Sequence, residues 1–149
     1  MNPQSRPTLR FATIGLNHNH IYGQTRALLD AGATLVSLFA PEDDLAADYQ
    51  RAFPQVRRVA DKRAILEDSS IDLVVSATIP DERAATAIEV MRHSKDVMVD
   101  KPGVITLDQL AAVRQVQAET GRIFSVCFAE RFENRATERA SQLVAASAI

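Results

Sequence analysis

The chain has 149 residues, 46% of them hydrophobic, which is enough for one domain with a buried core but too few for two comfortable ones. Its formal net charge of -2 excludes the basic stripe of a nucleic-acid-binding protein. No apolar run approaches the roughly 18 residues of a membrane span, and residues 1–10 lack the apolar core of a secretory signal. We therefore expect a cytoplasmic protein that binds neither membrane nor nucleic acid.

Strand and helix patterns alternate along the chain from its first apolar run. Residues 11–14 predict a strand that enters a polar turn, and the apolar spacing after the turn predicts a helix. Further strands are predicted at 34–39, 55–60, 71–77, 97–99 and 122–128. Helices are predicted from Pro41 to before Pro54, at 64–66, at 81–92, at 106–120, and from Phe132 through Ala136, Ala140, Leu143 and Val144.

This alternation predicts an α/β fold, a doubly wound, mainly parallel sheet of about six strands with helices on both faces. In such a sheet the turn after the first strand lies where the strand order reverses, and backbone N–H groups there bind phosphate. Gly15 can serve as the first glycine of G-x-G-x-x-G, followed by Leu16, but Asn17 stands at the second glycine. His18 and His20 add donors for a phosphate or a substrate.

The segment VMVDKPGVITLDQLAAV, residues 97–113, resembles the V-x-x-E-K-P-x-x-x-x-x-x-E-A segment of one enzyme family. That family comprises the nicotinamide-dependent glucose-fructose oxidoreductases, inositol dehydrogenases and rhizopine-catabolism enzymes. Asp100, Lys101 and Pro102 form the core of the match. Thr78-Ile79-Pro80 is similar to the family's T-P-N after the fourth strand, and Arg131-Phe132 to its R-F after the sixth. The resemblance covers roughly residues 8–145.

The resemblance implies that residues 1–149 are an NAD(P)-binding Rossmann-like domain. It also implies a second α/β domain that binds a sugar, inositol or related polyol and builds homo-oligomers, and we expect the chain to stop about where that domain begins. Lys101 matches the family lysine that contacts substrate and helps to move the hydroxyl proton. We therefore expect Lys101 to be catalytic in a complete enzyme, and this chain alone to bind cofactor without turnover.

The expected cofactor is NAD, with NADP possible. The expected cofactor-binding residues are Gly15, Leu16, Asn17, His18, His20, Ala40, Thr78, Ile79, Pro80, Asp100, Lys101, Pro102 and Arg131. Ala40 replaces the family's ribose-binding acid, Ile79 its proline, Pro80 its asparagine and Arg83 its usual histidine. The sequence around Ala40 has no arginine or lysine to pair with a 2′-phosphate, and Glu42, Asp43 and Asp44 would repel that group.

Each of these residues also has a simpler interpretation. His18 and His20 could be half a metal site, but zinc needs a third protein ligand and His93 lies on a different helix, so we expect no metal. Lys101 could be a solvated lysine, Thr78 could only end a strand, and Arg131 could be a surface arginine. The acids after Pro41 suit a helix first turn. Cys127 fits a buried strand residue better than a nucleophile.

Three function classes stay open. The first is the cofactor domain of a sugar or polyol oxidoreductase, favoured by Asp100-Lys101-Pro102 in its context. The second is a non-catalytic nucleotide-binding module for sensing or interaction, favoured by the incomplete glycine turn. The third, a methyltransferase that binds adenosylmethionine on a similar sheet, would leave Lys101 and Pro102 unexplained.

Overall fold

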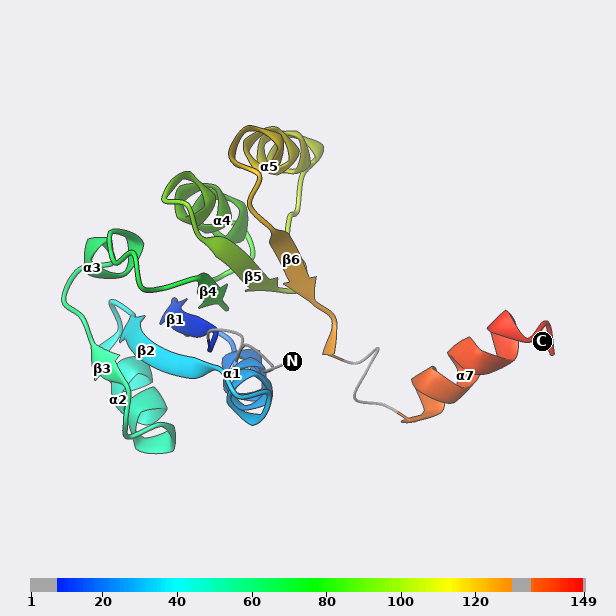
Figure 1. The fold of residues 1–149 in the computed structure, drawn as a ribbon, viewed down its shortest axis with the longest axis horizontal. Helices are drawn as coiled ribbons and strands as arrows, with labels where there is room; N and C mark the ends of the chain where they lie inside the picture. Colours follow the sequence, from blue (N-terminus) through cyan, green and yellow to red (C-terminus); the bar gives the residue numbers. More distant parts are fainter. Residues whose placement is uncertain (1–7, 130–134, 149) are drawn as a thin grey trace, which may run out of the picture.

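The computed structural model describes residues 8–129 and 135–148, and its strands and helices alternate as in Figure 1. The elements are β1 (Arg10–Ile14), α1 (His20–Asp30), β2 (Thr34–Phe39), α2 (Asp43–Ala52), β3 (Arg57–Arg58), α3 (Arg63–Leu66), β4 (Leu73–Ser76), α4 (Arg83–Arg92), β5 (Asp96–Asp100), α5 (Leu107–Thr120), β6 (Phe124–Cys127) and α7 (Arg135–Ala145).

The described strands form one six-stranded sheet in the order β3-β2-β1-β4-β5-β6, and every neighbouring pair is parallel. This confirms the predicted doubly wound α/β fold. The strand order reverses between β1 and β4, since β1 pairs with β2 on one side and with β4 on the other. The turns that follow β1, β4 and β5 therefore meet at the carboxyl edge of the sheet, where such folds bind ligands.

Helices cover both faces of the sheet, as Figure 1 shows, with α1 and α2 on one side and α3, α4 and α5 on the other. Two core clusters fill the spaces between the layers. Phe11 and Val75 belong to the cluster under α1 and α2, whereas Ala12 and Val74 belong to the cluster under α4 and α5. Neighbouring residues of a strand point to opposite faces, and near-continuous apolar strands are the usual result in a parallel sheet.

Helix ends in the structure follow the local sequence signals. Thr106 Oγ1 accepts the Gln109 backbone N–H at 3.1 Å, and Gly121 ends α5 with φ of 67°. These contacts confirm the predicted cap and stop. Helix α2 begins at Asp43 rather than at Pro41, because Glu42 is its extended N-cap residue.

Two expectations about strands need correction. The strand predicted at 55–60 shortens to Arg57–Arg58, because it pairs with β2 over two residues only at the sheet edge. Cys127 is half-buried rather than buried, because β6 is the opposite edge strand and pairs only with β5 in the described sheet.

Helix α7 confirms the last predicted helix over residues 135–145, while Phe132 lies outside the described residues. Figure 1 shows α7 away from the sheet, and none of the residues in it is buried. None of the helices in the described part of the chain is long and apolar enough to cross a membrane.

Candidate functional site

The turn after β1 is locked against the ends of its neighbouring strands at Gly15. The Gly15 N–H donates to the Phe39 carbonyl at 2.9 Å, and the Ala77 N–H donates to the Gly15 carbonyl at 3.2 Å. Gly15 has φ of +79°, and a Cβ there would lie 2.1 Å from Thr78 Cγ2. Both the backbone angle and the close approach require glycine.

The side chains of the next two residues of the turn already have partners within the protein. Leu16 is only 4% exposed and packs into the core under α1 and α2. Asn17 Nδ2 donates to Glu42 Oε1 at 2.9 Å, which ties the turn to the N-cap of α2. Only the backbone of Leu16 can face a ligand, and the Asn17 amide is already engaged by an acid.

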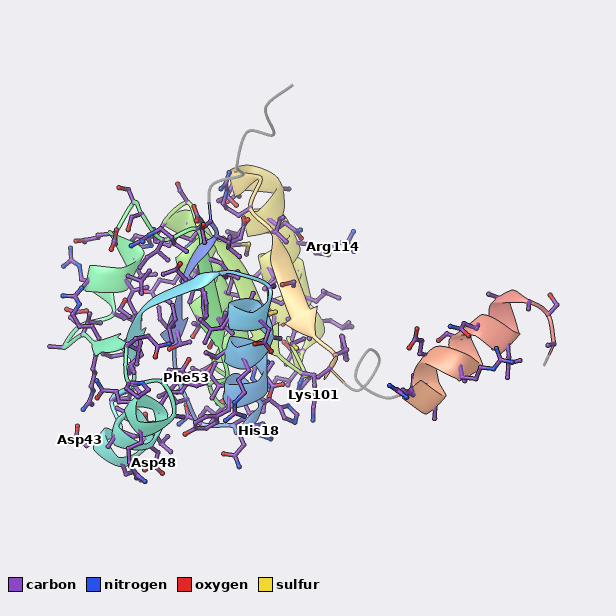
Figure 2. The ribbon with its side chains drawn as sticks, turned by 60° about the horizontal axis from the view of Figure 1, so that its bottom comes forward. His18, Asp43, Asp48, Phe53, Lys101 and Arg114 are labelled. Atoms are coloured by element: carbon purple, nitrogen blue, oxygen red, sulfur yellow. The ribbon has the colours of Figure 1, made fainter. Side chains whose placement is uncertain are left out.

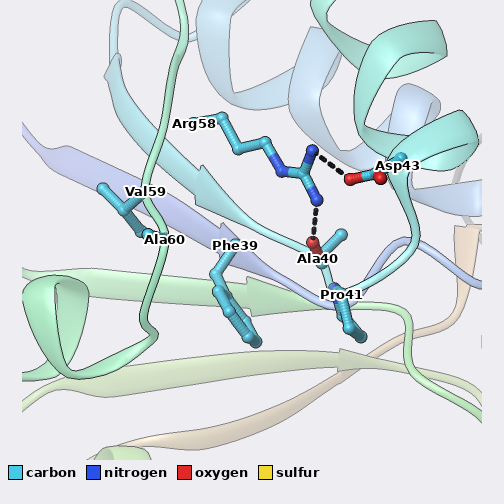
Figure 3. Close-up of a pocket in the computed structure, with 7 residues that line it drawn as sticks. All are labelled: Phe39, Ala40, Pro41, Asp43, Arg58, Val59 and Ala60. Carbon is cyan, nitrogen blue, oxygen red and sulfur yellow. Dashed lines mark hydrogen bonds and ion pairs between the residues drawn. The ribbon is translucent and has the colours of Figure 1, made fainter.

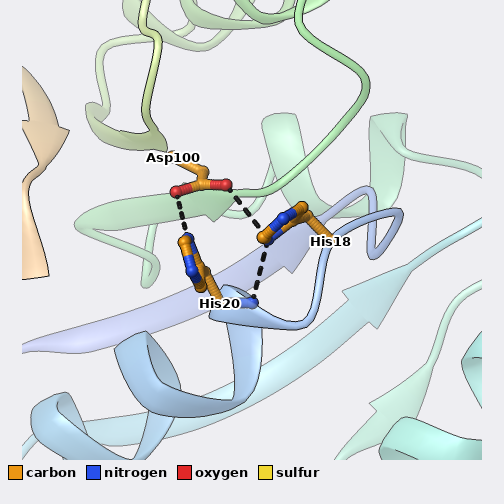
Figure 4. A group of neighbouring side chains, drawn as sticks. All are labelled: His18, His20 and Asp100. Atoms are coloured by element: carbon orange, nitrogen blue, oxygen red, sulfur yellow. Dashed lines mark hydrogen bonds and ion pairs between the residues drawn. The ribbon is translucent and has the colours of Figure 1, made fainter.

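His18 and His20 converge on the buried carboxylate of Asp100 at the end of β5 (Figure 4). His20 Nδ1 lies 2.9 Å from Asp100 Oδ1, and His18 Nδ1 lies 3.4 Å from Asp100 Oδ2. The Asp100 side chain is 1% exposed, whereas the side chains of His18 and His20 are 47% and 34% exposed. The third group beside the two histidines is therefore Asp100, which the sequence pattern did not indicate.

Arg83 holds Asp100 and the residues beside it in place. Its Nη2 donates to Asp100 Oδ2 at 3.2 Å, and its Nε donates to the Thr78 carbonyl at 2.8 Å. Its Nη1 donates to the carbonyls of Lys101 and Pro102. Burial lowers the pKa of Arg83, and the Asp100 carboxylate acts in the opposite direction. An arginine fork suits this task because its donors lie in one plane at fixed angles.

Lys101 borders an apolar hollow of about 470 Å³ on the β6 side of the sheet edge. The hollow is lined by Lys101, Pro102, Gly103, Val104, Leu110, Phe124, Val126 and Phe128. Lys101 is half-buried, and the Lys101–Pro102 peptide bond is cis. The lysine therefore stands between a charged cluster on one side and an apolar surface on the other.

A second hollow, of about 480 Å³, lies at the end of β2 beside Ala40 (Figure 3). Arg58 reaches it from β3: Nη2 donates to the Ala40 carbonyl at 2.8 Å, and Nη1 pairs with Asp43 Oδ1 at 2.7 Å. The expectation that no basic residue stands near Ala40 is therefore wrong. Arg58 is 18 residues further along the chain, so only the pairing of β3 with β2 brings it there.

The other expected site residues that the structure describes differ in how far their side chains are exposed. Thr78 is 6% exposed and forms the wall against Gly15, whereas Ile79 is 44% exposed and Pro80 is exposed. Arg131 lies outside the described residues. Figure 2 shows Asp43, His18 and Lys101 along one edge of the molecule, which is the edge to which the turns after β1, β2 and β5 contribute.

Comparison with known proteins gives consistent matches. The profile of the oxidoreductase family with an NAD-binding Rossmann fold, named for Gfo, Idh and MocA, matches residues 9–128. The scyllo-inositol 2-dehydrogenase (NAD(+)) of Bacillus subtilis is 28% identical over 126 residues, which cover 84% of this chain and 37% of that protein. The crystal structure of a candidate oxidoreductase from Erwinia carotovora atroseptica is 42% identical, with a TM-score of 0.89, over 92% of this chain and 41% of that one.

The WlbA dehydrogenase of Bordetella pertussis, solved with NADH and UDP-GlcNAcA, has a TM-score of 0.82 over 95% of this chain and 42% of that one. At 19% identity this likeness shows the fold alone. The chain spans about two fifths of the length of these relatives. Since the family profile covers the sheet from β1 to the end of β6, the chain belongs to the Gfo/Idh/MocA oxidoreductase family and comprises its NAD-binding Rossmann fold.

Proposed function

We propose that this chain is the cofactor-binding domain of an NAD(P)-dependent oxidoreductase that transfers a hydride between the nicotinamide and a sugar, inositol or related polyol. One observation carries the proposal. Asp100 and Lys101, at the end of β5, lie against the turn after β1, because Asp100 contacts both His18 and His20. That juxtaposition stands at the point of strand-order reversal, where dinucleotides bind in this class of sheet.

The residues present fit a dinucleotide along the sheet edge. The glycine turn and the start of α1 offer backbone N–H groups to a pyrophosphate, since Gly15 leaves no side chain there. The hollow beside Ala40 suits an adenosine ribose. Thr78, Ile79 and Pro80 would border the nicotinamide half of the dinucleotide, and Asp100, Lys101 and Pro102 would lie beyond them. Arg131 remains a proposed contact from the sequence.

The nicotinamide, when bound, supplies a hydride acceptor or donor. The chain itself would supply the group that accepts or donates the proton of the substrate hydroxyl. When a carbinol carbon loses hydride, the hydroxyl oxygen must lose a proton, and we propose that the Lys101 amine accepts it. Arg83 fixes the Lys101 backbone through the Lys101 carbonyl, so the lysine starts from a fixed position. Fixed placement of this kind lowers the entropic part of a barrier.

NAD remains the first proposed cofactor and NADP the second. The relative from Bacillus subtilis is named as NAD(+)-dependent. In this chain Asp43 already pairs with Arg58, so an incoming 2′-phosphate must compete with a carboxylate for the guanidinium. Because Ala40 replaces the acid that would bind the ribose hydroxyls of NAD, we expect the preference for NAD over NADP to be modest.

The proposal extends to the setting of the enzyme. We place it in the cytoplasm, since its single cysteine, Cys127, cannot form a disulfide within the chain. We propose a homo-oligomer whose partners are the dinucleotide and a small polyol, with no nucleic acid and no membrane. A second domain of the complete enzyme would supply most of the substrate contacts.

A non-catalytic nucleotide-binding module is the second candidate. The feature that favours it is the turn itself, where Asn17 and His20 stand at the second and third glycine positions. His20 directs its ring to Asp100, into space that a glycine would leave to a ligand. A longer chain that binds NADH but oxidises no polyol, with the same result in Lys101→Ala, would favour this candidate.

The first test is direct titration of the chain with NADH. We expect saturable enhancement of nicotinamide fluorescence, an increase in melting temperature, and displacement by NAD. Adenosylmethionine is the matched negative ligand and should leave the melting temperature unchanged. A chain that binds no nicotinamide dinucleotide, or binds adenosylmethionine instead, would overturn the proposal.

A further inference from the structure

We propose that His18, His20 and Asp100 form a binding site for a divalent transition-metal ion of the zinc type. The proposal goes beyond the dinucleotide and the polyol, and it reverses the expectation of no metal. That expectation rested on a missing third ligand, and Asp100, 80 residues from His20 in sequence, provides it. Two histidines and one carboxylate are a common donor set for a metal site with an open position.

The spacing of the donor atoms suits one ion. Ligand atoms from the three residues lie within 4.8 Å of one another. Ligands about 2.1 Å from a tetrahedral ion are about 3.4 Å apart. The His18 Nδ1 to Asp100 Oδ2 distance is 3.4 Å, and the His20 Nδ1 to Asp100 Oδ1 distance is 2.9 Å. The widest separation that the 4.8 Å limit allows exceeds the tetrahedral spacing by about 1.4 Å, so rotation of the two part-exposed rings would have to bring the ligand atoms closer.

The carboxylate is already oriented by neighbours that are not ligands. Lys101 N–H donates to Asp100 Oδ1 at 2.8 Å, and Arg83 Nη2 donates to Oδ2 at 3.2 Å. The two imidazole rings contact each other edge to face, with centroids 4.2 Å apart. Fixed outer contacts of this kind are typical of metal sites, where they orient the ligands before the ion arrives.

The contacts of His18 point to a positive charge in the centre of the cluster. Its Nδ1 accepts the His20 backbone N–H at 3.3 Å, and the same atom lies 3.4 Å from Asp100 Oδ2. A nitrogen lone pair facing a carboxylate oxygen is repulsive. A metal ion held by both atoms would take that lone pair in place of the His20 N–H and would convert this repulsion into attraction.

Arg83 determines which metals can bind. Its guanidinium neutralises much of the Asp100 charge, so the site behaves as two imidazoles and one weakened carboxylate. Mg²⁺ and Ca²⁺ need several charged or carbonyl oxygens and should not bind. Zn²⁺, Co²⁺ and Ni²⁺ bond well to imidazole and tolerate low ligand charge. Three protein ligands leave a position for water or a substrate hydroxyl.

The experiment uses the untagged 149-residue chain after treatment with a chelator, without dinucleotide. Zn²⁺ is titrated by calorimetry, and bound metal is counted by elemental analysis after dialysis. Co²⁺ serves as a spectroscopic probe, because imidazole ligands give it visible absorption bands. We expect one equivalent of Zn²⁺ per chain. His18→Ala and His20→Ala should each weaken binding by more than about tenfold, and the double variant should abolish it.

The controls come from the chain itself. It has three histidines, and His93, the C-cap residue of α4, should be replaceable by alanine without effect on Zn²⁺ binding. Cys127→Ser should also leave Zn²⁺ binding unchanged. Asp100→Asn should lose binding, with folding checked by circular dichroism, and the part-exposed His18 keeps the test valid if Asp100→Asn unfolds. Absence of stoichiometric Zn²⁺, unchanged binding in the double variant, or equal binding of Mg²⁺ would overturn the proposal.

Discussion

Arg83 is the residue on which the geometry of the candidate site most depends. It is 2% exposed, and its guanidinium joins the Thr78 carbonyl at the end of β4 to the Asp100 carboxylate at the end of β5. A buried arginine is costly unless its donors are satisfied, and here each nitrogen has an acceptor. Arg83 is therefore a positioning residue as well as the counter-charge of Asp100.

We predict that Arg83→Met destabilises the fold by roughly 3 kcal/mol, because it leaves the buried Asp100 carboxylate without its cation. Urea unfolding at neutral pH measures the change. Arg63→Met is the matched control: Arg63 is exposed and pairs with Glu67 at 2.8 Å on the surface, so its loss should change stability little. Equal stability of Arg83→Met and the parent chain would show that the histidines alone can support Asp100.

Arg58 should decide how well the chain accepts NADP. Loss of its guanidinium in Arg58→Ala should weaken NADPH binding by about tenfold or more, the size expected for one charged hydrogen bond, and change NADH binding much less. Arg57→Ala, at the exposed neighbouring position of β3, is the control. Fluorescence titration of both dinucleotides gives the ratio. A similar loss for NADH and NADPH would mean that Arg58 only supports the Ala40 loop.

At the residue scale, the sequence predicted those site residues whose roles depend on residues next to them in the chain. Gly15 follows from the strand before it, and Lys101 follows from the resemblance of its segment. Arg58 lies beside Ala40 because β3 pairs with β2, and Asp100 lies beside His20 because of the order of β1, β4 and β5 in the sheet. These partners are 18 and 80 residues apart in the chain, so no local pattern indicates them. The same reason explains why Asp100 was not predicted as the third member of the histidine cluster.

At the element scale, apolar periodicity was sufficient for the buried layers. β2 lies at residues 34–39 as predicted, because TLVSLF is a short β-branched run with sheet neighbours on both sides. Agreement is poorer at the edges. β3 keeps two residues because pairing with β2 alone supports it, and β6 leaves Cys127 half-buried. Edge position is a tertiary property that the local pattern does not contain.

The layer of α1 and α2 is tied together by Tyr49, whose hydroxyl lies 2.5 Å from Thr25 Oγ1. Burial raises the pKa of Tyr49 to about 12, whereas its hydrogen bond to Thr25 acts in the opposite direction. The folded chain therefore keeps the phenol protonated at a pH where the unfolded chain has lost that proton. The associated stability is fully present below about pH 10, the ordinary tyrosine value, and is lost as the pH rises towards about 12.

Tyr49→Phe should accordingly cost about 1 kcal/mol at neutral pH, because Thr25 loses its partner. The difference should shrink and then change sign by about pH 11, since phenylalanine has no proton to retain. Urea unfolding of both chains at the two pH values tests the crossing. Parallel pH profiles of the two chains would contradict the assignment of this alkaline loss to Tyr49.

At the scale of the whole molecule, exposed apolar residues lie at the β6 edge of the sheet and on α7. Ile123 and Phe128, at the two ends of β6, are 58% and 56% exposed, and Val144 of α7 is 62% exposed. The hollow beside Lys101 opens on the same side, between Phe124 and Phe128. Lys101 is therefore half-buried next to an open apolar surface rather than inside a closed, dry site. Hydride transfer needs a closed site, so we expect this chain alone to bind cofactor without turnover.

That apolar surface should also govern association of the 149-residue chain in solution. An open edge strand offers unpaired backbone groups, and exposed apolar area beside it adds a driving force, so we predict a homodimer or a swapped terminus through β6 or α7. Light scattering over a concentration series measures the mass. Ile123→Lys with Phe128→Lys should shift the chain to monomer, because charge on an edge strand opposes pairing. Leu9→Lys, at a 40% exposed apolar position before β1, should leave the mass unchanged. A parent chain that stays monomeric at high concentration would show that this surface has too little area, or the wrong shape, to bind a second copy.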